Sequence, residues 1–345
     1  MLENQQSENA SPTSAGLPLI SFVLPVFNER EVLPAFHARL SEALVPLQGR
    51  YRFELIAVDD GSSDGSTQWL QQLAENDDRL VVLALSRNFG QQAAITAGLD
   101  HAGGEAVVIM DSDLQDPPEI AVELIRAWEA GNVEVVYATR LTRRENYLKR
   151  LTANAFYRLF SALSEIPVPR NTGDFRLLDR RVVQAIGCMR EKNRYMRGLS
   201  AYAGFRQTAV VFDRPNRAAG TTKYSMTRML RLAFDAIFSF STAPLKAIIW
   251  LGLGTFMISA LGIAYAIFMK FVFPEITVSG WTLMIIAILF IGGVQMLSIG
   301  VLGAYIGKIY TEVQDRPIYI VADAASTRVR QAEPKTARGM NDESA

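Results

Sequence analysis

Four polar clusters in the first third of the chain combine residue types that bind nucleotides and metal ions. Carboxylates that follow a buried strand are costly unless they meet a cation or hydrogen-bond donors. A Mg²⁺ or Mn²⁺ ion that bridges such carboxylates to nucleotide phosphates would supply the cation. The clusters are Pro25-Val26-Phe27-Asn28-Glu29, Asp59-Asp60-Gly61-Ser62-Ser63-Asp64, Arg87-Asn88-Phe89-Gly90 and Asp111-Ser112-Asp113-Leu114-Gln115-Asp116-Pro117-Pro118.

The last cluster is the best candidate for a metal site. A turn at this position would let Asp111 and Asp113 face one ligand, so we assign Asp113 and Gln115 to a metal and Asp111 to the metal or to a nucleotide ribose. An Asp-x-Asp pair alone is weak, because such pairs also cap helices and fill turns. Asp64 and Ser66 have that alternative role. The sequence has one Cys and two His, so any metal must be held by oxygen.

The elements that must position these clusters alternate along residues 19–138. Each of the first four apolar runs precedes a turn cluster and a helix-like stretch, such as 90–102 or 118–130. This alternation predicts an α/β fold with a mostly parallel sheet, whose ligands bind beyond the carboxyl ends of the strands. The predicted strands are 19–25, 53–58, 80–85, 106–110 and 133–138.

The charge of the chain is zero only on average. Among the 345 residues, 35 are Lys or Arg and 35 are Asp or Glu, which disfavours a basic nucleic-acid binder. Residues 1–138 carry a net charge of −14, residues 139–231 carry +14, and the remainder is neutral. This division indicates that two parts of one chain handle differently charged ligand groups.

Two uncharged stretches, 247–269 and 281–306, are long enough to cross a bilayer, which takes about 20 apolar residues. Their short connection, 270–280, makes them a transmembrane hairpin, and the alternative is a buried hairpin of a soluble protein. Arg228, Arg231 and Lys246 precede the first span, and Lys308 and Arg316 follow the second. The positive-inside rule therefore places both flanks in the cytoplasm.

The remaining segments complete the predicted domain organisation. Residues 146–163 and 225–240 have apolar stripes and basic flanks, typical of interfacial amphipathic helices, although ordinary core-facing helices fit the same pattern. We predict the following parts: a disordered terminus over 1–17, a catalytic domain over 18–224, a juxtamembrane helix over 225–243, the hairpin over 244–309, and a mostly disordered cytoplasmic tail over 310–345.

The ordered motifs resemble the polyprenyl-phosphate glycosyltransferases of glycosyltransferase family 2, which include dolichyl-phosphate mannose synthases and bactoprenol glucosyltransferases. The four clusters above carry the resemblance, together with Thr172-Gly173-Asp174-Phe175-Arg176, the later Arg217 and Lys223, and the stretch 297–310 at the end of the second span. The likeness extends over roughly residues 19–321. It implies a GT-A, Rossmann-like catalytic domain.

The resemblance also implies a role for each candidate residue. The nucleotide-sugar would be bound by Pro25, Phe27, Glu29, Val58, Asp60, Asp111 and Ser112. Asp111, Asp113 and Gln115 would hold Mg²⁺ or Mn²⁺, and Arg140, Arg217 and Lys223 would bind phosphates, including that of the acceptor. Asp113 and Asp174 would be the catalytic residues. Asp174 either orients the acceptor and its cationic partners or acts as general base; a structural role is a further alternative.

These implications define an expected activity. The enzyme would be a metal-dependent, inverting transferase that moves one sugar, first of all glucose from UDP-glucose, onto undecaprenyl phosphate. Other donors (aminoarabinose type, N-acetylhexosamine or mannose) remain open, as do a processive polysaccharide synthase and a catalytically silent membrane scaffold. The synthase is disfavoured because the chain has no Gln-x-x-Arg-Trp motif.

The expected setting is the inner membrane of a bacterium, with the catalytic domain and both termini in the cytoplasm. The expected partners are the bilayer, a flippase and a periplasmic transferase that modifies lipopolysaccharide or another envelope glycan. Small residues in the spans, such as Gly303 and Gly307, would permit helix packing within one chain or in a homo-oligomer.

Overall fold

The structure is a computed structural model that describes residues 16–140, 172–212, 243–272 and 280–325. The chain divides into two compact units. The sheet unit comprises Met1–Glu145, Val168–Gly220 and Pro317–Ala345, and the helical unit comprises Asn146–Pro167 and Thr221–Arg316.

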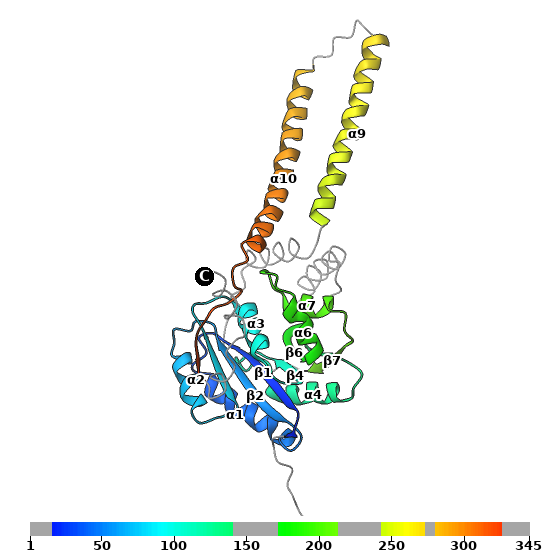
Figure 1. The fold of residues 1–345 in the computed structure, drawn as a ribbon. Helices are drawn as coiled ribbons and strands as arrows, with labels where there is room; N and C mark the ends of the chain where they lie inside the picture. The colour runs from blue at the N-terminus through cyan, green and yellow to red at the C-terminus, as the bar shows by residue number, and fades with distance from the viewer. Residues whose placement is uncertain (1–15, 141–171, 213–242, 273–279, 326–345) are drawn as a thin grey trace, which may run out of the picture. The chain divides into compact units, whose positions relative to one another are not determined.

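In the described part of the sheet unit, eight strands form one sheet in the order β7-β5-β6-β4-β1-β2-β3-β8 (Figure 1). Strand β1 is parallel to both β2 and β4, whereas β6 and the edge strand β8 are antiparallel to their neighbours. The mostly parallel α/β sheet expected from the sequence is thereby confirmed. The strands are β1 (Leu19–Val26), β2 (Arg52–Asp59), β3 (Leu80–Leu85), β4 (Ala106–Ile109), β5 (Val135–Arg140), β6 (Thr172–Asp179), β7 (Gln207–Phe212) and β8 (Val321–Ala325).

Helices cover both faces of this sheet. One hydrophobic cluster joins it to α1 (Leu33–Leu44), α2 (Ser66–Ala74) and α4 (Pro118–Glu129). A second cluster joins the opposite face to α3 (Gln91–His101), α6 (Arg180–Cys188) and α7 (Met196–Tyr202). A short 3₁₀ helix, η2 (Val45–Leu47), follows α1.

The central strand β1 shows why the sequence forms this three-layer arrangement. Ile20, Phe22 and Leu24 pack into the first cluster, and Val23 packs into the second. A strand buried on both faces reads as a continuous apolar run, as β1 does. The polar residues therefore follow the carboxyl end of the strand, where the first predicted cluster begins.

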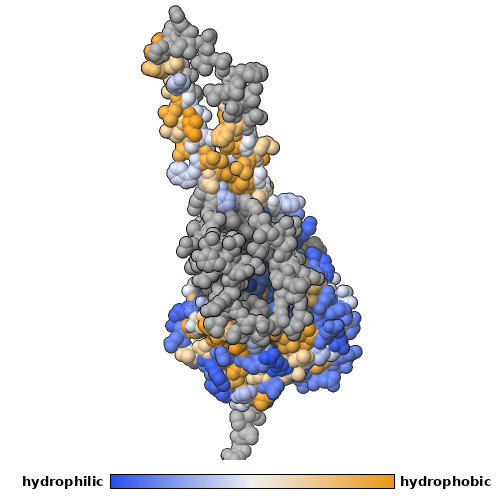
Figure 2. All heavy atoms as spheres, turned by 180° about the vertical axis from the view of Figure 1, so that it is seen from behind, coloured by the Kyte–Doolittle hydropathy of each residue, from blue (hydrophilic) through white to orange (hydrophobic). Residues whose placement is uncertain are grey.

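The helical unit contains two long apolar helices, α9 (Ala243–Val272) and α10 (Trp281–Val313). Each holds a segment long and apolar enough to cross a membrane, Ala247–Met269 and Phe290–Val313, and none of the described residues in these segments is buried. Figure 2 shows their hydrophobic side chains gathered on the outer surface of the helices. A core helix of a soluble protein would bury such surface, so these helices favour membrane association.

Three boundaries differ from expectation. The first span agrees with 247–269, but α10 continues through Lys308 to Val313, past the predicted span end at 306 and the hairpin end at 309. Within the tail predicted as mostly disordered, Val321–Ala325 forms β8, because Val321 and Ala324 pack against the second hydrophobic cluster while the backbone pairs with β3. Strands β6 and β7 were not predicted.

Several predicted segments lie outside the described residues. These are most of the N-terminal segment 1–17, the amphipathic stretch 146–163, and 225–242 of the predicted juxtamembrane helix. The predicted division into parts therefore stays a prediction there.

Gly98 lets α3 pack closely on β1, which generates a prediction about stability. A Cβ at Gly98 would lie 2.3 Å from Val23 Cγ1 inside the core, whereas a Cβ at Gly187 of α6 would meet no atom within 4 Å. We expect Gly98→Ala to destabilise the protein by about 1–3 kcal/mol through overpacking. Gly187→Ala should be neutral or stabilising by up to about 1 kcal/mol. Thermal unfolding of the two variants checks this, and equal effects would contradict it.

Candidate active site

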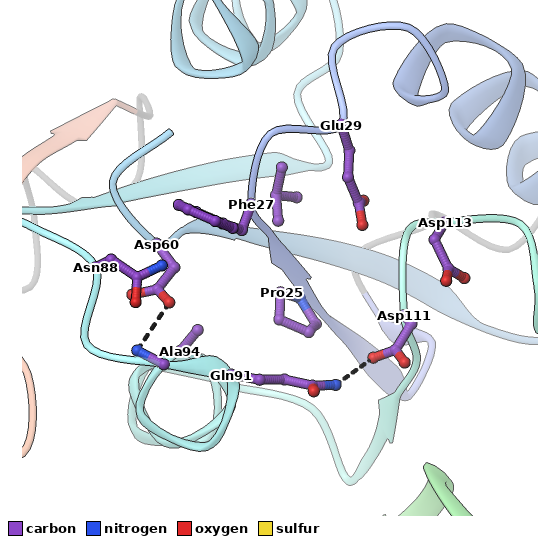
Figure 3. Close-up of a pocket in the computed structure, with 11 residues that line it drawn as sticks. Pro25, Phe27, Glu29, Asp60, Asn88, Gln91, Ala94, Asp111 and Asp113 are labelled. Atoms are coloured by element: carbon purple, nitrogen blue, oxygen red, sulfur yellow. Dashed lines mark hydrogen bonds between the residues drawn. The ribbon is translucent and has the colours of Figure 1, made fainter. Parts of the chain in front are cut away.

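A cavity of about 340 Å³ lies where β1, β2 and β4 end (Figure 3). Asp60 and Asn88 lie at one end of it and Asp111 and Asp113 at the other, with Pro25 between them. Carboxyl ends of parallel strands are the usual ligand-binding edge of such a sheet. The described residues that line the cavity are Pro25, Val26, Phe27, Glu29, Asp60, Asn88, Gly90, Gln91, Ala94, Asp111 and Asp113.

The loops after β1 and β2 are tied together by short polar side chains. Ser63 N donates to Asn28 Oδ1 over 2.8 Å, and Arg30 N donates to Asp64 Oδ2 over 2.9 Å. Ser66 Oγ donates to the other Asp64 oxygen over 2.6 Å. Asp64 and Ser66 therefore make turn contacts, one part of the alternative role that the sequence offered, whereas the N-cap of α2 is Gly65. The result is a fixed path for the segment that carries Phe27 and Glu29.

Asp60 organises the loop after β3. Its two carboxylate oxygens accept hydrogen bonds from Phe89 N, over 2.7 Å, and from Gly90 N, over 2.8 Å. Gly90 has φ of 98°, a conformation that favours glycine. Burial raises the pKa of Asp60, and the two backbone hydrogen bonds oppose that shift. The motif Arg87-Asn88-Phe89-Gly90 is thus held against the cavity by the carboxylate of Asp60, the residue that follows β2.

The other end of the cavity concentrates negative charge. Burial raises the pKa of Asp111 to about 7, and the charges of Asp116, Asp113 and Asp174 act in the same direction. Gln91 Nε2 donates to Asp111 Oδ1 over 2.7 Å, which partly compensates for this repulsion. The carboxylates are close enough to repel one another, so a bound cation would stabilise them.

Glu29 belongs to the same acidic group. Burial raises its pKa to about 7, the Ser112 hydroxyl opposes this shift, and the charges of Asp113 and Asp111 add to it. Ser112 Oγ contacts Glu29 Oε2 and lies 3.0 Å from the carbonyl oxygen of Pro25. Buried Ser112 therefore connects the end of β1 to the segment after β4.

The residues present fit a divalent cation whose ligands come partly from the protein and partly from a substrate. Among the described residues, no group of three or more His, Cys, Asp and Glu side chains could hold a metal unaided. Mg²⁺, however, commonly takes only one or two carboxylates and completes its shell with water and phosphate oxygens. Asp111 and Asp113 provide such a pair of oxygen ligands on one cavity wall.

Asp174 lies in β6, on the side of the site where α3 and α7 meet. Its Oδ1 accepts a hydrogen bond from Arg197 Nε and its Oδ2 accepts one from Gln92 Nε2, each over 3.0 Å. The charge of Asp174 contributes to the raised pKa of Asp111. The structure therefore brings Asp174 near Asp111, and its catalytic role stays a prediction.

The remaining predicted residues divide into two groups. Val58 is buried in the core. Gln115 is not among the described residues that line the cavity, and its backbone N–H donates to Asp113 Oδ1 over 2.9 Å. Arg140 ends β5, but its side chain is outside the described part of the structure, as are Arg217 and Lys223 altogether. The proposed role of each of these residues stays a prediction.

Sequence reasoning missed Gln91, Gln92 and Arg197. Gln91 and Gln92 directly follow the recognised Arg-Asn-Phe-Gly motif and open a helix, a position that points toward a ligand at a sheet edge. Arg197 carried no comparable signal, because only the tertiary fold brings it to Asp174.

A three-layer α/β domain with an acidic cavity at this sheet edge has the arrangement in which α/β enzymes commonly bind their ligands. The family described as Glycosyl transferase family 2 matches residues 21–187. An uncharacterized glycosyltransferase of Synechocystis is 45% identical, over 88% of this chain and 95% of its own length. The chain therefore belongs to glycosyltransferase family 2 and is a transferase.

Relatives with a named activity are similar over the same extent. A bactoprenol glucosyl transferase derived from the SfII prophage of Shigella flexneri is 42% identical over 88% of this chain and 97% of its own length. A prophage bactoprenol glucosyl transferase homolog of Escherichia coli is 40% identical over 88% and 98%. Among solved structures, the glucosyl-3-phosphoglycerate synthase of Mycobacterium tuberculosis matches with a TM-score of 0.41 and 18% identity, over 69% of this chain and 86% of that one.

The raised pKa values of Glu29 and Asp111 predict that the metal-free protein becomes less stable as pH rises. Their folded-state values, about 7, exceed the ordinary 4.5 and 3.8, so the native state binds more protons between about pH 4 and about pH 7. We expect Asp111→Asn to weaken this dependence, so that the fall in Tm over that range is smaller by about 2–4 °C. Thermal unfolding in chelator, with exposed Asp78→Asn as control, checks this. An unchanged slope in Asp111→Asn would contradict it.

Proposed function

We propose that the protein transfers one glucose from UDP-glucose to undecaprenyl phosphate, with inversion, and that it requires Mg²⁺ or Mn²⁺. Two observations support this proposal: Asp111 and Asp113 share a wall of the cavity, and relatives named bactoprenol glucosyl transferase are similar over nearly their whole length. The exposed apolar helices α9 and α10 fit an enzyme that meets its lipid substrate in a membrane.

The donor would occupy the cavity lengthwise. The exposed ring of Phe27 provides an apolar face for a base at the Asp60 end, where Asn88 offers an amide. The diphosphate would lie at the other end, where Asp111 and Asp113 would hold the metal. When bound, the ion would neutralise the charge that develops on the leaving nucleoside diphosphate.

The acceptor needs little activation. The second pKa of a phosphate monoester is about 6, so near neutral pH a phosphate oxygen can attack the anomeric carbon without giving up a proton. The new carbon–oxygen bond forms as the bond to the nucleoside diphosphate breaks on the opposite face, which inverts the anomeric centre. Both oxygens of Asp174 already accept hydrogen bonds, so an orienting role suits it better than that of a base.

The same proposal includes the cellular setting and partners. It places the enzyme in a bacterial inner membrane with the catalytic domain and both chain ends in the cytoplasm, because the basic flanks of the two spans follow the positive-inside rule. The lipid-linked sugar would pass to a flippase and then to a periplasmic transferase.

The donor and product are testable directly. Full-length protein is incubated with undecaprenyl phosphate, Mn²⁺ and, separately, UDP-glucose, UDP-N-acetylglucosamine, GDP-mannose or an aminoarabinose nucleotide, and the lipids are analysed by mass. We expect one hexose per lipid, with UDP-glucose preferred. A lipid carrying several sugars, or no lipid product with any donor, would overturn the proposal.

Metal dependence has its own test. Asp113→Asn should lower Mn²⁺-dependent UDP affinity by roughly tenfold or more, because a carboxylate ligand becomes a neutral amide. The exposed Asp78→Asn serves as the matched control and should bind UDP normally. Binding is measured by titration calorimetry with and without Mn²⁺, and equal affinity of the two variants would contradict the assignment.

Asp174→Asn separates orientation from donor binding. The amide cannot pair with Arg197 as the carboxylate does, so we expect kcat to fall by about a hundredfold while UDP affinity is retained. Turnover equal to that of the unaltered enzyme would show that the carboxylate is dispensable.

A further inference from the structure

Asp174 is the centre of a polar cluster that joins three elements. Arg197 of α7 and Gln92 of α3 donate to its two oxygens, each over 3.0 Å. Gln92 Oε1 in turn accepts a hydrogen bond from Met196 N over 2.8 Å. The amide of Gln92 therefore connects β6 to the start of α7, and the direction of the Arg197 guanidinium is fixed by these contacts.

A second arginine lies beside this ion pair. Arg176, two residues beyond Asp174 on β6, is 3% exposed. Its Nη1 donates to Ser200 Oγ over 2.5 Å and its Nη2 to the carbonyl oxygen of Gly173 over 3.0 Å. Its Nε is buried with no hydrogen-bond partner among the described residues. Burial lowers the pKa of Arg176 to about 10, and the charge of Asp174 opposes that shift while that of Arg197 adds to it.

Arg176 and Arg197 both lie beside Asp174, and each guanidinium group interacts with its carboxylate. Two guanidinium groups thus share one carboxylate. An anion beside the partly exposed Arg197 would pair with its guanidinium group.

The position of the cluster indicates which anion would bind beside Arg197. No described residue of β6 or α7 lines the nucleotide cavity. Yet Gln91, which donates to Asp111 on the cavity wall, is the chain neighbour of Gln92, which donates to Asp174. The cluster therefore lies next to the end of the cavity that contains Asp111, but outside the cavity itself.

We propose that Arg197, oriented by Asp174 and backed by Arg176, binds the phosphate group of the acceptor. This inference rests on the proposed function, in which the attacking group is a phosphate monoester. A guanidinium suits this task because its planar N–H fork matches two phosphate oxygens. Arg197 donates to Asp174 through Nε–H, and Tyr195 also contacts its side chain. The side chain is 31% exposed, whereas that of Asp174 is 8% exposed, so the guanidinium is the accessible member of the ion pair.

Arg197→Met and Arg197→Lys test this in the full-length protein. The matched control is Arg206→Met. It removes an arginine that pairs with Glu134, which directly precedes β5, at the end of that strand opposite to the site. KM and kcat are measured with undecaprenyl phosphate, binding of undecaprenyl phosphate and of undecaprenol is measured without donor, and UDP affinity is measured with Mn²⁺.

We expect Arg197→Met to raise KM and Kd for undecaprenyl phosphate by roughly tenfold or more. Arg197→Lys should raise them less, because it keeps the charge but loses the fork. Affinity for undecaprenol and UDP should not change, and Arg206→Met should behave as the unaltered protein. If Arg197→Met does not fold, Arg197→Lys decides alone.

Three results would overturn the inference. The first is an unchanged KM for undecaprenyl phosphate in both Arg197 variants, whatever the change in kcat. The second is an equal loss of UDP affinity, which would assign the guanidinium to the donor diphosphate. The third is equal binding of undecaprenol and undecaprenyl phosphate by the unaltered protein.

The proposed function and the proposed phosphate site can fail separately. If the unaltered protein binds undecaprenyl phosphate through Arg197 but forms no glycolipid, the proposed function fails and the phosphate site stands. If it forms glycolipid and the Arg197 variants keep their KM, the phosphate site fails and the function stands.

Discussion

Three carboxylates from three different strands or strand ends accept hydrogen bonds from three consecutive residues at the start of α3. Gly90 N donates to Asp60, Gln91 to Asp111 and Gln92 to Asp174. Like charges collected at one sheet edge repel each other and lose solvation, so each needs a donor. The first turn of one helix provides all three donors, and it thereby fixes the positions of Asp60, Asp111 and Asp174 relative to one another.

This arrangement depends on how firmly α3 is held. Its residues from Ala93 to Leu99 are buried, and Gly98 allows the helix to approach β1 more closely than any side chain would permit. A shift of α3 would change all three hydrogen bonds together. The packing of α3 in the core therefore also determines the hydrogen bonds of the three carboxylates, because the same helix takes part in both.

Much of this architecture follows from the sequence. Apolar runs such as Leu19–Val26 predict buried parallel strands, and the polar clusters that follow them predict the acidic edge that Pro25, Asp60, Asp111 and Asp113 form. The contacts of Asp174 with Gln92 and Arg197 were not predictable, because they join residues 82 and 23 positions apart through the packing of α3, β6 and α7. Strand β8 was missed because Val-Ala-Asp-Ala-Ala has low β-propensity and gains its stability from pairing with β3.

Strand β8 also gives the chain an order of assembly. It pairs with β3, yet in sequence it follows both apolar helices. During synthesis, β3 therefore remains an open sheet edge until the ribosome has produced α9 and α10, and open edges are sites of wrong pairing. The sheet unit can close this edge only after both long apolar helices have been made, so pairing of β8 with β3 requires that α9 and α10 have already been synthesised.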